Sequence, residues 1–471
     1  MKNQFYYLWL ILFIVITNVN ADNPSILVGD DANKSVHPNA KYISRQAYIQ
    51  NPYLNFPSLG GTQNVSESAY NHHNVAQKWF TDGTWNVLGE ASYMGVNGST
   101  NIGYGANIFA QTGSVAGFSF GGLLTVMNPF FSAQLQTNNI ANEAQTLPVD
   151  RQTTPQELFV EYQYSNIVQA DVGWIGISNS PWLTYYQNNT LNLVTYQGAL
   201  VNVNPGGGWL LTGIAINGAQ LVGQSGFSGL TMYNPHFNRG TRADDVGDQT
   251  TTGTIALGAN WSTPKNLYNL RLWGYDFMNY TQMLYTDSTI NLAASDDIKF
   301  TIGAQAAVQD GDSVNILNAA GYGDSVHSNM VGLQLGFSYR WFGVQLSYNN
   351  VWGPETAFEG GGLISPYTYQ YGSDPLYTTS WMQGLVEKSA GQAFKIGTPL
   401  TFLDNNLTIY PSIAYYATTT IPASTEYNLV TSYSIPQVKG FTIFGAFGQL
   451  TQPDESGGNV QQVQLLLSYL Y

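Results

Sequence analysis

The residues most able to do chemistry in this chain are few, and they do not form a catalytic set. Histidine is the commonest general base, and all five histidines stand outside the strand-like runs described below: His37, His72, His73, His236 and His327. The pair His72-His73 lacks a third ligand at a useful spacing, so we interpret it as part of a polar loop rather than a metal site. Gly206–Gly208 is interpreted as a turn, because no lysine follows it as in a phosphate loop. We therefore expect no enzyme activity, no cofactor and no metal site.

Charged residues within the strand-like runs indicate a different chemistry, the electrostatic selection of a passing solute. Successive side chains of a strand point to opposite faces, and Lys299 and Lys395 fall on faces opposite large apolar residues. Arg271 shares its face with Trp273 and Tyr275, so its direction stays open. A charge about 4 Å from an ion contributes about 1–4 kcal/mol, which is enough to set charge preference in a pore. With Lys388 from a long loop, the candidate pore-lining residues are Arg271, Lys299, Arg340, Lys388, Lys395, Glu90, Glu161 and Asp171.

These positions depend on strand-like runs that recur from Trp85 onward. Their lengths suit tilted strands that cross a bilayer, and an even number is what a single-chain bacterial barrel requires. We predict an all-β fold, a transmembrane antiparallel β-barrel of about 18 strands. The runs are 85–95, 102–111, 115–127, 157–165, 168–177, 195–203, 208–217, 253–261, 267–278, 281–292, 298–309, 330–340, 341–351, 393–403, 407–417, 425–435, 441–450 and 460–471.

The connections between these runs alternate in length. Connections after even-numbered runs are mostly short, such as 112–114 and 404–405. Connections after odd-numbered runs include the long ones, among them 128–156, 218–252 and 352–392. Short periplasmic turns at one rim and long extracellular loops at the other are typical of outer-membrane barrels. The alternation therefore supports the barrel independently of the strand count.

Composition favours the same class of protein. Charged residues make up 9% of the chain, against about 25% in soluble domains, whereas aromatic residues make up 14%, with 32 tyrosines. Beyond the first residues no apolar stretch is long enough for a membrane-spanning helix. A closed barrel is the other structure that satisfies its backbone groups in lipid. The net charge of −14 argues against a nucleic-acid partner.

The first part of the chain divides into two predicted segments. Met1-Lys2, an apolar stretch over 5–16 and a small residue at Ala21 are the parts of a secretory signal peptide, so we expect cleavage after residue 21. Residues 22–84 are rich in turn-forming residues, and we expect either a periplasmic extension or a plug. Residues 85–471 form the predicted barrel.

The last run, 460–471, resembles the C-terminal assembly signal of bacterial outer-membrane barrels. Val463, Leu465 and Leu467 share one face of the run with Tyr469 and Tyr471. In a barrel this face would meet the acyl chains, with aromatic residues at the interface. We therefore assign Tyr469 and Tyr471 to the assembly signal and expect the barrel-assembly machinery as a partner. The expected location is the outer membrane of a Gram-negative cell.

Two motifs resemble the OprD-type family of outer-membrane porins. One is the strand Leu191–Val201, which follows a loop that begins at Pro181, and the other is the long segment Ser373–Lys388 before Lys395. The resemblance extends loosely over 85–471. It implies an 18-stranded, narrowed porin for small nutrients such as carboxylates, amino acids or peptides, with basic residues along its path. This chain offers only a short version of that basic ladder: Arg271, Lys299, Arg340 and Lys395.

We therefore predict an outer-membrane porin that passes small hydrophilic solutes by diffusion. The connection 352–392 is long and rich in aromatic residues, so we expect it to fold inward and narrow the lumen; its alternative place is over the outer rim. Two other functions stay open, a structural or adhesive barrel and a hydrophobic-compound transporter with an N-terminal plug. Expected partners include outer-membrane lipid and lipopolysaccharide, and the protein is expected to be a monomer or a homotrimer.

Overall fold

A computed structural model of the chain describes residues 82–97, 99–130, 151–183, 193–221, 224–234, 246–263, 266–295, 297–311, 316–317, 320, 326–367, 375–419, 422–453 and 458–471. The predicted signal peptide and almost all of the predicted 22–84 segment lie outside these residues. Among the described residues, no helix is long and apolar enough to cross a membrane.

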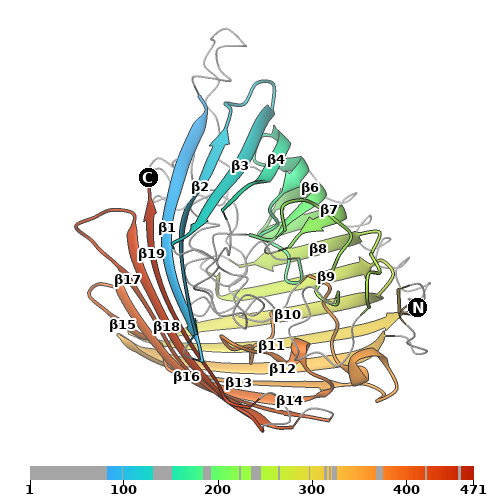
Figure 1. Ribbon diagram of the computed structural model, residues 1–471, viewed down its shortest axis with the longest axis vertical. Coiled ribbons are helices and arrows are strands. Elements are labelled where there is room, and N and C mark those ends of the chain that lie inside the picture. The colour runs from blue at the N-terminus through green and yellow to red at the C-terminus, as the bar shows by residue number, and fades with distance from the viewer. Residues whose placement is uncertain are drawn as a thin grey trace.

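The described residues form one antiparallel sheet that closes on itself (Figure 1). Apart from β14 and β15, which both pair with β13 and β16, each strand pairs with its sequence neighbours. β1 pairs with both β2 and β19, which closes the ring. The strands are β1 (Thr84–Val96), β2 (Ser99–Gln111), β3 (Phe118–Pro129), β4 (Gln152–Tyr164), β5 (Val168–Ile175), β6 (Thr195–Gly206), β7 (Trp209–Gln220), β8 (Thr254–Ser262), β9 (Tyr268–Phe277), β10 (Thr281–Ala293), β11 (Ile298–Gly311), β12 (Val326–Tyr339), β13 (Phe342–Trp352), β14 (Gly391–Gly397), β15 (Leu400–Phe402), β16 (Leu407–Thr418), β17 (Ser424–Ser434), β18 (Phe441–Thr451) and β19 (Val460–Leu470).

The barrel has 18 strand positions, because β14 and β15 occupy a single position between β13 and β16. The interruption falls at Thr398-Pro399, where proline has no N–H to offer the ladder. The predicted fold class and each of the 18 predicted runs are thereby confirmed. All the long connections lie at one end of the barrel, here called the loop rim, and the connections at the other end, the turn rim, are short.

Several predicted boundaries were wrong, two of them for local reasons. The run expected to begin at Glu157 begins at Gln152, because a register shift at Leu123/Leu124 accommodates Pro155 inside the strand. The run expected at 115 begins at Phe118, after a turn in which Ala116 has a φ of 51°. β12 begins at Val326 rather than at 330.

The strands alternate between an apolar outer face and a polar inner face, as β12 illustrates. Leu333 is 59% exposed on the outside, whereas Gln334 beside it is 2% exposed on the inside. Large apolar side chains are exposed in the same way on the outer faces of many of the strands, and soluble proteins rarely expose so extensive an apolar surface. This arrangement instead fits a barrel whose outer face contacts acyl chains.

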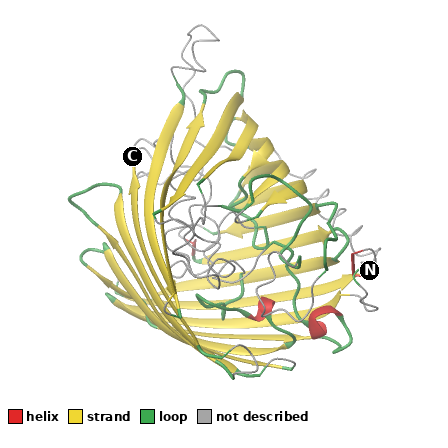
Figure 2. Ribbon diagram, viewed as in Figure 1, coloured by secondary structure: helices red, strands yellow, loops and turns green. Residues whose placement is uncertain are grey.

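The main hydrophobic core lies within the ring rather than between two layers. Inward-facing wall residues such as Tyr275 pack there with residues of several connections, among them Trp182, Tyr233 and Leu363. Figure 2 shows loops, in green, crossing the space that the strands enclose. Two short 3-10 helices, η3 (Phe358–Gly361) and η4 (Leu385–Glu387), belong to the β13–β14 connection.

Candidate functional site

Part of the β13–β14 connection lies flat against the inner wall. This segment, Thr378–Gln383, is here called the strap. Its first residue donates from both its N–H and its hydroxyl to Asn349 Oδ1, each over 3.0 Å. The Tyr416 hydroxyl donates to the carbonyls of the first and last strap residues, over 2.8 and 2.9 Å. Asn428 donates to Ser380 Oγ over 2.7 Å. Glu426 Oε1 accepts the N–H of Met382 over 2.7 Å.

Two further contacts hold the strap in place. Lys395 projects inward from β14, and its Nζ donates to the carbonyl of Thr379 over 2.6 Å. Trp381 is fully buried against wall residues that include Val430 and Phe444. Polar and apolar contacts thus fix the same short segment on the strands from β13 to β18. The prediction that this connection folds inward agrees with the position of its described residues.

The earlier part of the same connection is held on another sector of the wall. The side-chain amide of Gln309 on β11 donates to the carbonyl of Ile364 over 2.7 Å and accepts the N–H of Ile364 over 2.8 Å. The N–H of Ser365 donates to the Tyr233 hydroxyl over 3.2 Å, which joins this connection to the one between β7 and β8. Burial raises the pKa of Tyr367 to about 12.

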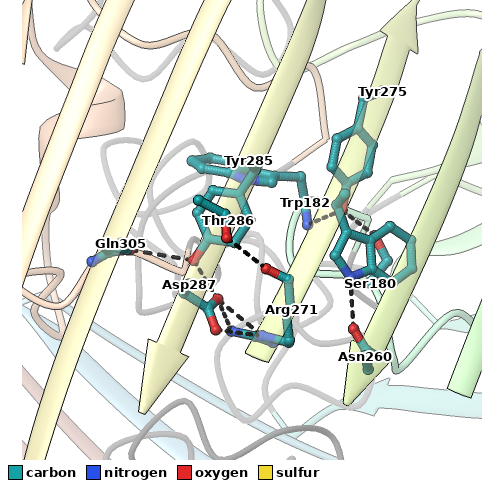
Figure 3. A network of polar contacts seen from close by, with 10 residues as sticks. Ser180, Trp182, Asn260, Arg271, Tyr275, Tyr285, Thr286, Asp287 and Gln305 are labelled. Atoms are coloured by element: carbon teal, nitrogen blue, oxygen red, sulfur yellow. Dashed lines mark hydrogen bonds and ion pairs between the residues drawn. The ribbon is translucent and has the colours of Figure 1, made fainter. Parts of the chain in front are cut away.

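An aromatic ladder lines the inner face of β9. Trp273, Tyr275 and Phe277 stack in succession, with ring centroids 5.6 and 5.3 Å apart. The Tyr275 hydroxyl lies 2.9 Å from Ser180 Oγ, and Trp182 meets the ring of Tyr285 edge-on (Figure 3). The β5–β6 connection is therefore also folded inward and covers these rings.

A buried ion pair lies next to the ladder, between neighbouring strands. Arg271 on β9 and Asp287 on β10 stand opposite each other in register, with Arg271 Nη2 2.6 Å from Asp287 Oδ2 (Figure 3). The Tyr285 hydroxyl donates to the same carboxylate over 2.7 Å and accepts a hydrogen bond from the Gln305 amide nitrogen over 3.3 Å. Arg271 thus faces the lumen, although its positive charge is matched there by Asp287.

The remaining predicted bases occupy different heights of the wall. Lys299 lies inside at the turn rim, opposite Ser338. Arg340 lies in the β12–β13 turn at a φ of 52° and forms a 3.1 Å ion pair with Asp297. The hydrogen bond and the charge of Asp297 raise the pKa of Arg340 above its usual value. Lys388 is buried near the loop rim, directly after η4. The structure therefore does not bring Arg340 together with Lys388 and Lys395.

The predicted acids all point into the barrel, in two separate places. Glu161 and Asp171 stand opposite each other on β4 and β5, near the turn rim. Glu161 accepts hydrogen bonds from Gln111 over 2.8 Å and from Gln169 over 2.6 Å. Glu90 lies alone on β1 and is 6% exposed.

Sequence reasoning missed several residues that shape the site. Asn349, Tyr416, Glu426 and Asn428 anchor the strap, and Asp287 neutralises Arg271. Strand parity alone places each of these side chains on an inner face. What each one contacts depends on how the strands and loops pack, which parity does not reveal.

A Gly-Xaa-Ser-Xaa-Gly pattern at Gly117–Gly121 was also missed. In hydrolases this pattern forms a sharp turn between a strand and a helix. Here Ser119 lies within β3, and its hydroxyl donates to Glu161 Oε1 over 3.3 Å. The stretch is therefore a wall strand rather than a nucleophile elbow.

Comparison with known proteins supports the fold. No protein-family model and no curated protein matches the sequence. Solved structures do match, including OccAB3 of Acinetobacter baumannii, with a TM-score of 0.66 and 14% identity over 83% of this chain and 100% of that one. OpdK of Pseudomonas aeruginosa gives 0.66 and 14% over 83% and 99%. OccK8 (OprE) of Pseudomonas aeruginosa gives 0.67 and 13% over 83% and 99%. The resemblance to OprD-type porins is thus confirmed at the level of fold, and the chain has the closed 18-stranded barrel of these outer-membrane proteins.

Proposed function

We propose that this protein is an outer-membrane porin, a passive channel for small hydrophilic solutes whose lumen is narrowed by loops folded inside it. The observation that carries the proposal is the strap, Thr378–Gln383, which is hydrogen-bonded to the inner wall of a closed barrel. A structural barrel needs no ordered segment attached to its inner wall. A selective channel needs a constriction of fixed shape.

Barrel size and wall chemistry support passive diffusion. Barrels of 16–18 strands enclose a space wide enough for an aqueous channel. The inner wall is polar along strands such as β19, where Gln462 and Gln464 face inward. The strap occupies part of this space, and a net contribution of about 1 kcal/mol from each hydrogen bond keeps it in one position. Solute size is then limited by the room that the strap and the other loops leave.

Orientation in the membrane follows from the two rims. The loop rim would face the outside of the cell and the turn rim the periplasm, as in other outer-membrane barrels. Export by a signal peptide over residues 1–21 and insertion by the barrel-assembly machinery complete this proposal. They are supported by the sequence patterns at the two ends.

The contacts of the basic residues bear on the class of solute. OpdK was crystallised with vanillate and OccK2 (OpdF) with glucuronate, both small carboxylates. In this chain Arg271 is ion-paired with Asp287, and Lys395 donates to the strap. The charge of Arg271 is therefore compensated, and one N–H of the Lys395 ammonium group is engaged by the strap backbone. The function is therefore stated for small hydrophilic solutes, without a carboxylate preference.

Conductance of the purified protein in a planar bilayer tests the proposal. The wild-type protein should form discrete channels, and replacing residues 359–387 with a short Gly-Ser linker should raise the single-channel conductance, because the strap no longer occupies the lumen. Heat-modifiable migration on gels confirms that the variant is folded. A folded wild-type protein that carries no current would contradict the porin function. Wild-type conductance in the shortened variant would contradict the role of the strap.

A further inference from the structure

Two inward-facing positions of the barrel wall carry a glycine that lies directly against the β13–β14 connection. Gly448 on β18 contacts Trp381 and Met382 of the strap. Gly303 on β11 contacts Tyr377, the residue that precedes the strap. The side chains packed on these glycines are buried, since Trp381 is 0% and Tyr377 is 3% exposed. The two glycines are here called the seats.

Space, rather than backbone conformation, requires glycine at the seats. Neither seat has a positive φ, so the backbone conformation permits any L-residue there. A Cβ atom at Gly448 would lie 2.7 Å from Met382 Sδ and 2.8 Å from Trp381 Cε3. A Cβ atom at Gly303 would lie 2.8 Å from Tyr377 Oη and 3.0 Å from Tyr377 Cζ. Carbon atoms pack best at about 3.5–4.0 Å, so a side chain at either seat would push the connection away from the wall.

Each seat is a gap of one residue in a wall that side chains otherwise cover. The residues opposite the seats on the neighbouring strands are all buried and carry side chains: Asn428 and Gln462 beside Gly448, and Thr289 and Gln334 beside Gly303. A ring in such a gap lies on the backbone of the wall, whereas layers separated by side chains stand about 10 Å apart. The seats therefore let the connection lie deeper in the wall than another residue type would allow.

The seats lie at the two ends of a path across the wall, from β11 to β18. Between them the strap is hydrogen-bonded to Asn349 on β13, to Lys395 on β14 and to Asn428 on β17. These hydrogen bonds remain when a seat is filled by a side chain. The strap would then be lifted toward the lumen at that end rather than released from the wall.

We propose that Gly303 and Gly448 determine the solute size limit of the channel, because they hold Tyr377 and Trp381 in the wall and so keep the strap out of the permeation path. A side chain at either seat moves the strap toward the middle of the lumen and narrows the channel. This inference rests on the proposed channel function and extends it by naming the positions that set the width of the channel.

Single-channel conductance tests the seats. Gly448→Ala should lower the conductance and Gly448→Val should lower it further, because a larger side chain lifts Trp381 further. The permeability of tetraethylammonium relative to K⁺ should fall in the same order, because the larger ion is more sensitive to the width. The matched controls are Gly89→Ala and Gly89→Val on the outer face of β1, where an added Cβ atom lies 4.0 Å from the carbonyl oxygen of Tyr469. Both should keep the wild-type values.

Two combined variants separate lifting of the strap from narrowing by the valine itself. When residues 359–387 are replaced with a Gly-Ser linker, Gly448→Val should leave the conductance unchanged, because no strap is present to be lifted. Trp381→Ala should bring the conductance of Gly448→Val back at least to the wild-type value, because loss of the indole leaves room for the valine. Gly303→Ala should lower the conductance in the same way, and it tests the proposal if Gly448→Val does not fold. Heat-modifiable migration on gels reports folding.

The outcomes distinguish this inference from the proposed function. A folded wild-type protein that carries no current contradicts the channel function itself. A conducting wild-type protein whose folded Gly448→Val and Gly303→Ala variants keep or exceed its conductance overturns the role of the seats and leaves the channel intact. An equal loss of conductance from Gly448→Val with and without the strap would show that the valine itself narrows the channel, which also overturns the role of the seats.

Discussion

At the scale of single residues, charges that strand parity places inside the barrel are used in different ways. The ammonium group of Lys395 donates to the carbonyl of Thr379 in the strap, and the charge of Arg271 is neutralised by Asp287. Glu90 has no comparable partner among the described residues. An inward-facing charge is therefore not evidence of solute contact. Its partners decide whether it shapes the channel or meets what passes through it.

The contact between Lys395 and the strap gives a prediction at this scale. Lys395→Met removes a hydrogen bond from a charged donor, which contributes about 1.5–3 kcal/mol, while the other anchors of the strap remain. We expect a looser strap, seen as greater open-channel current noise and a modest rise in single-channel conductance. Lys299→Met is the matched control, because it removes the same charge from the inner wall at the turn rim. Equal noise in the two variants would show that Lys395 does not hold the strap.

At the scale of elements, the seam between β1 and β19 closes the barrel. Beyond the end of β19, Tyr471 exchanges backbone hydrogen bonds of 2.9 and 3.2 Å with Val87, and its ring lies 5.5 Å from that of Trp85. The Tyr471 side chain is 70% exposed on the outside. A tyrosine at this position fits the aromatic belt of a barrel in lipid.

The seam gives a prediction about assembly. Tyr471→Asp places a charge at the edge of the lipid-facing band and removes the ring contact with Trp85, so less folded barrel should reach the outer membrane. Tyr471→Phe retains the ring and should assemble at the wild-type level. The measurement is the amount of heat-modifiable, protease-resistant protein in outer-membrane fractions. Equal amounts of folded protein in the Tyr471→Asp and Tyr471→Phe variants would show that Tyr471 is not part of the assembly signal.

At the scale of the whole molecule, the outer face of the barrel is apolar where that of a soluble protein is polar, and an apolar core also lies inside the barrel. Leucines and aromatic residues are exposed around the outside, whereas glutamines and asparagines of the strands are buried inward. The loops add a second, apolar core within the lumen. The outer face is therefore suited to contact with lipid, and the loops narrow the space inside.

The lipid-facing band gives a prediction at this scale. Leu333→Arg places a charge on the outer face of β12, which should lower the free energy of unfolding by about 2–4 kcal/mol if the site lies near the bilayer midplane. Leu333→Met keeps the surface apolar and should change it little. Urea unfolding of protein reconstituted in lipid vesicles, followed by tryptophan fluorescence, measures both. Equal stability of the two variants would show that this face does not contact lipid.

Local patterns in the sequence were sufficient to predict the barrel architecture. Alternation with period two identified the 18 wall strands, because the two faces of a barrel strand meet solvents of opposite polarity. Turn-forming residues and connection lengths separated the two rims. The boundaries failed where a local feature broke the period, as at Pro155 and at the turn before Phe118.

The site depended on contacts between residues far apart in the sequence. Trp273 and Tyr275 left the direction of Arg271 open, because aromatic residues usually mark the lipid face; inside this barrel the loops cover them. Which loop segment lies against Asn349 and Tyr416, and which residues stand opposite Glu90, depend on the register of the strands and on closure of the ring. Alternation is a property of one strand and can be read from it, whereas a partner exists only after the strands have paired and the loops have packed between them.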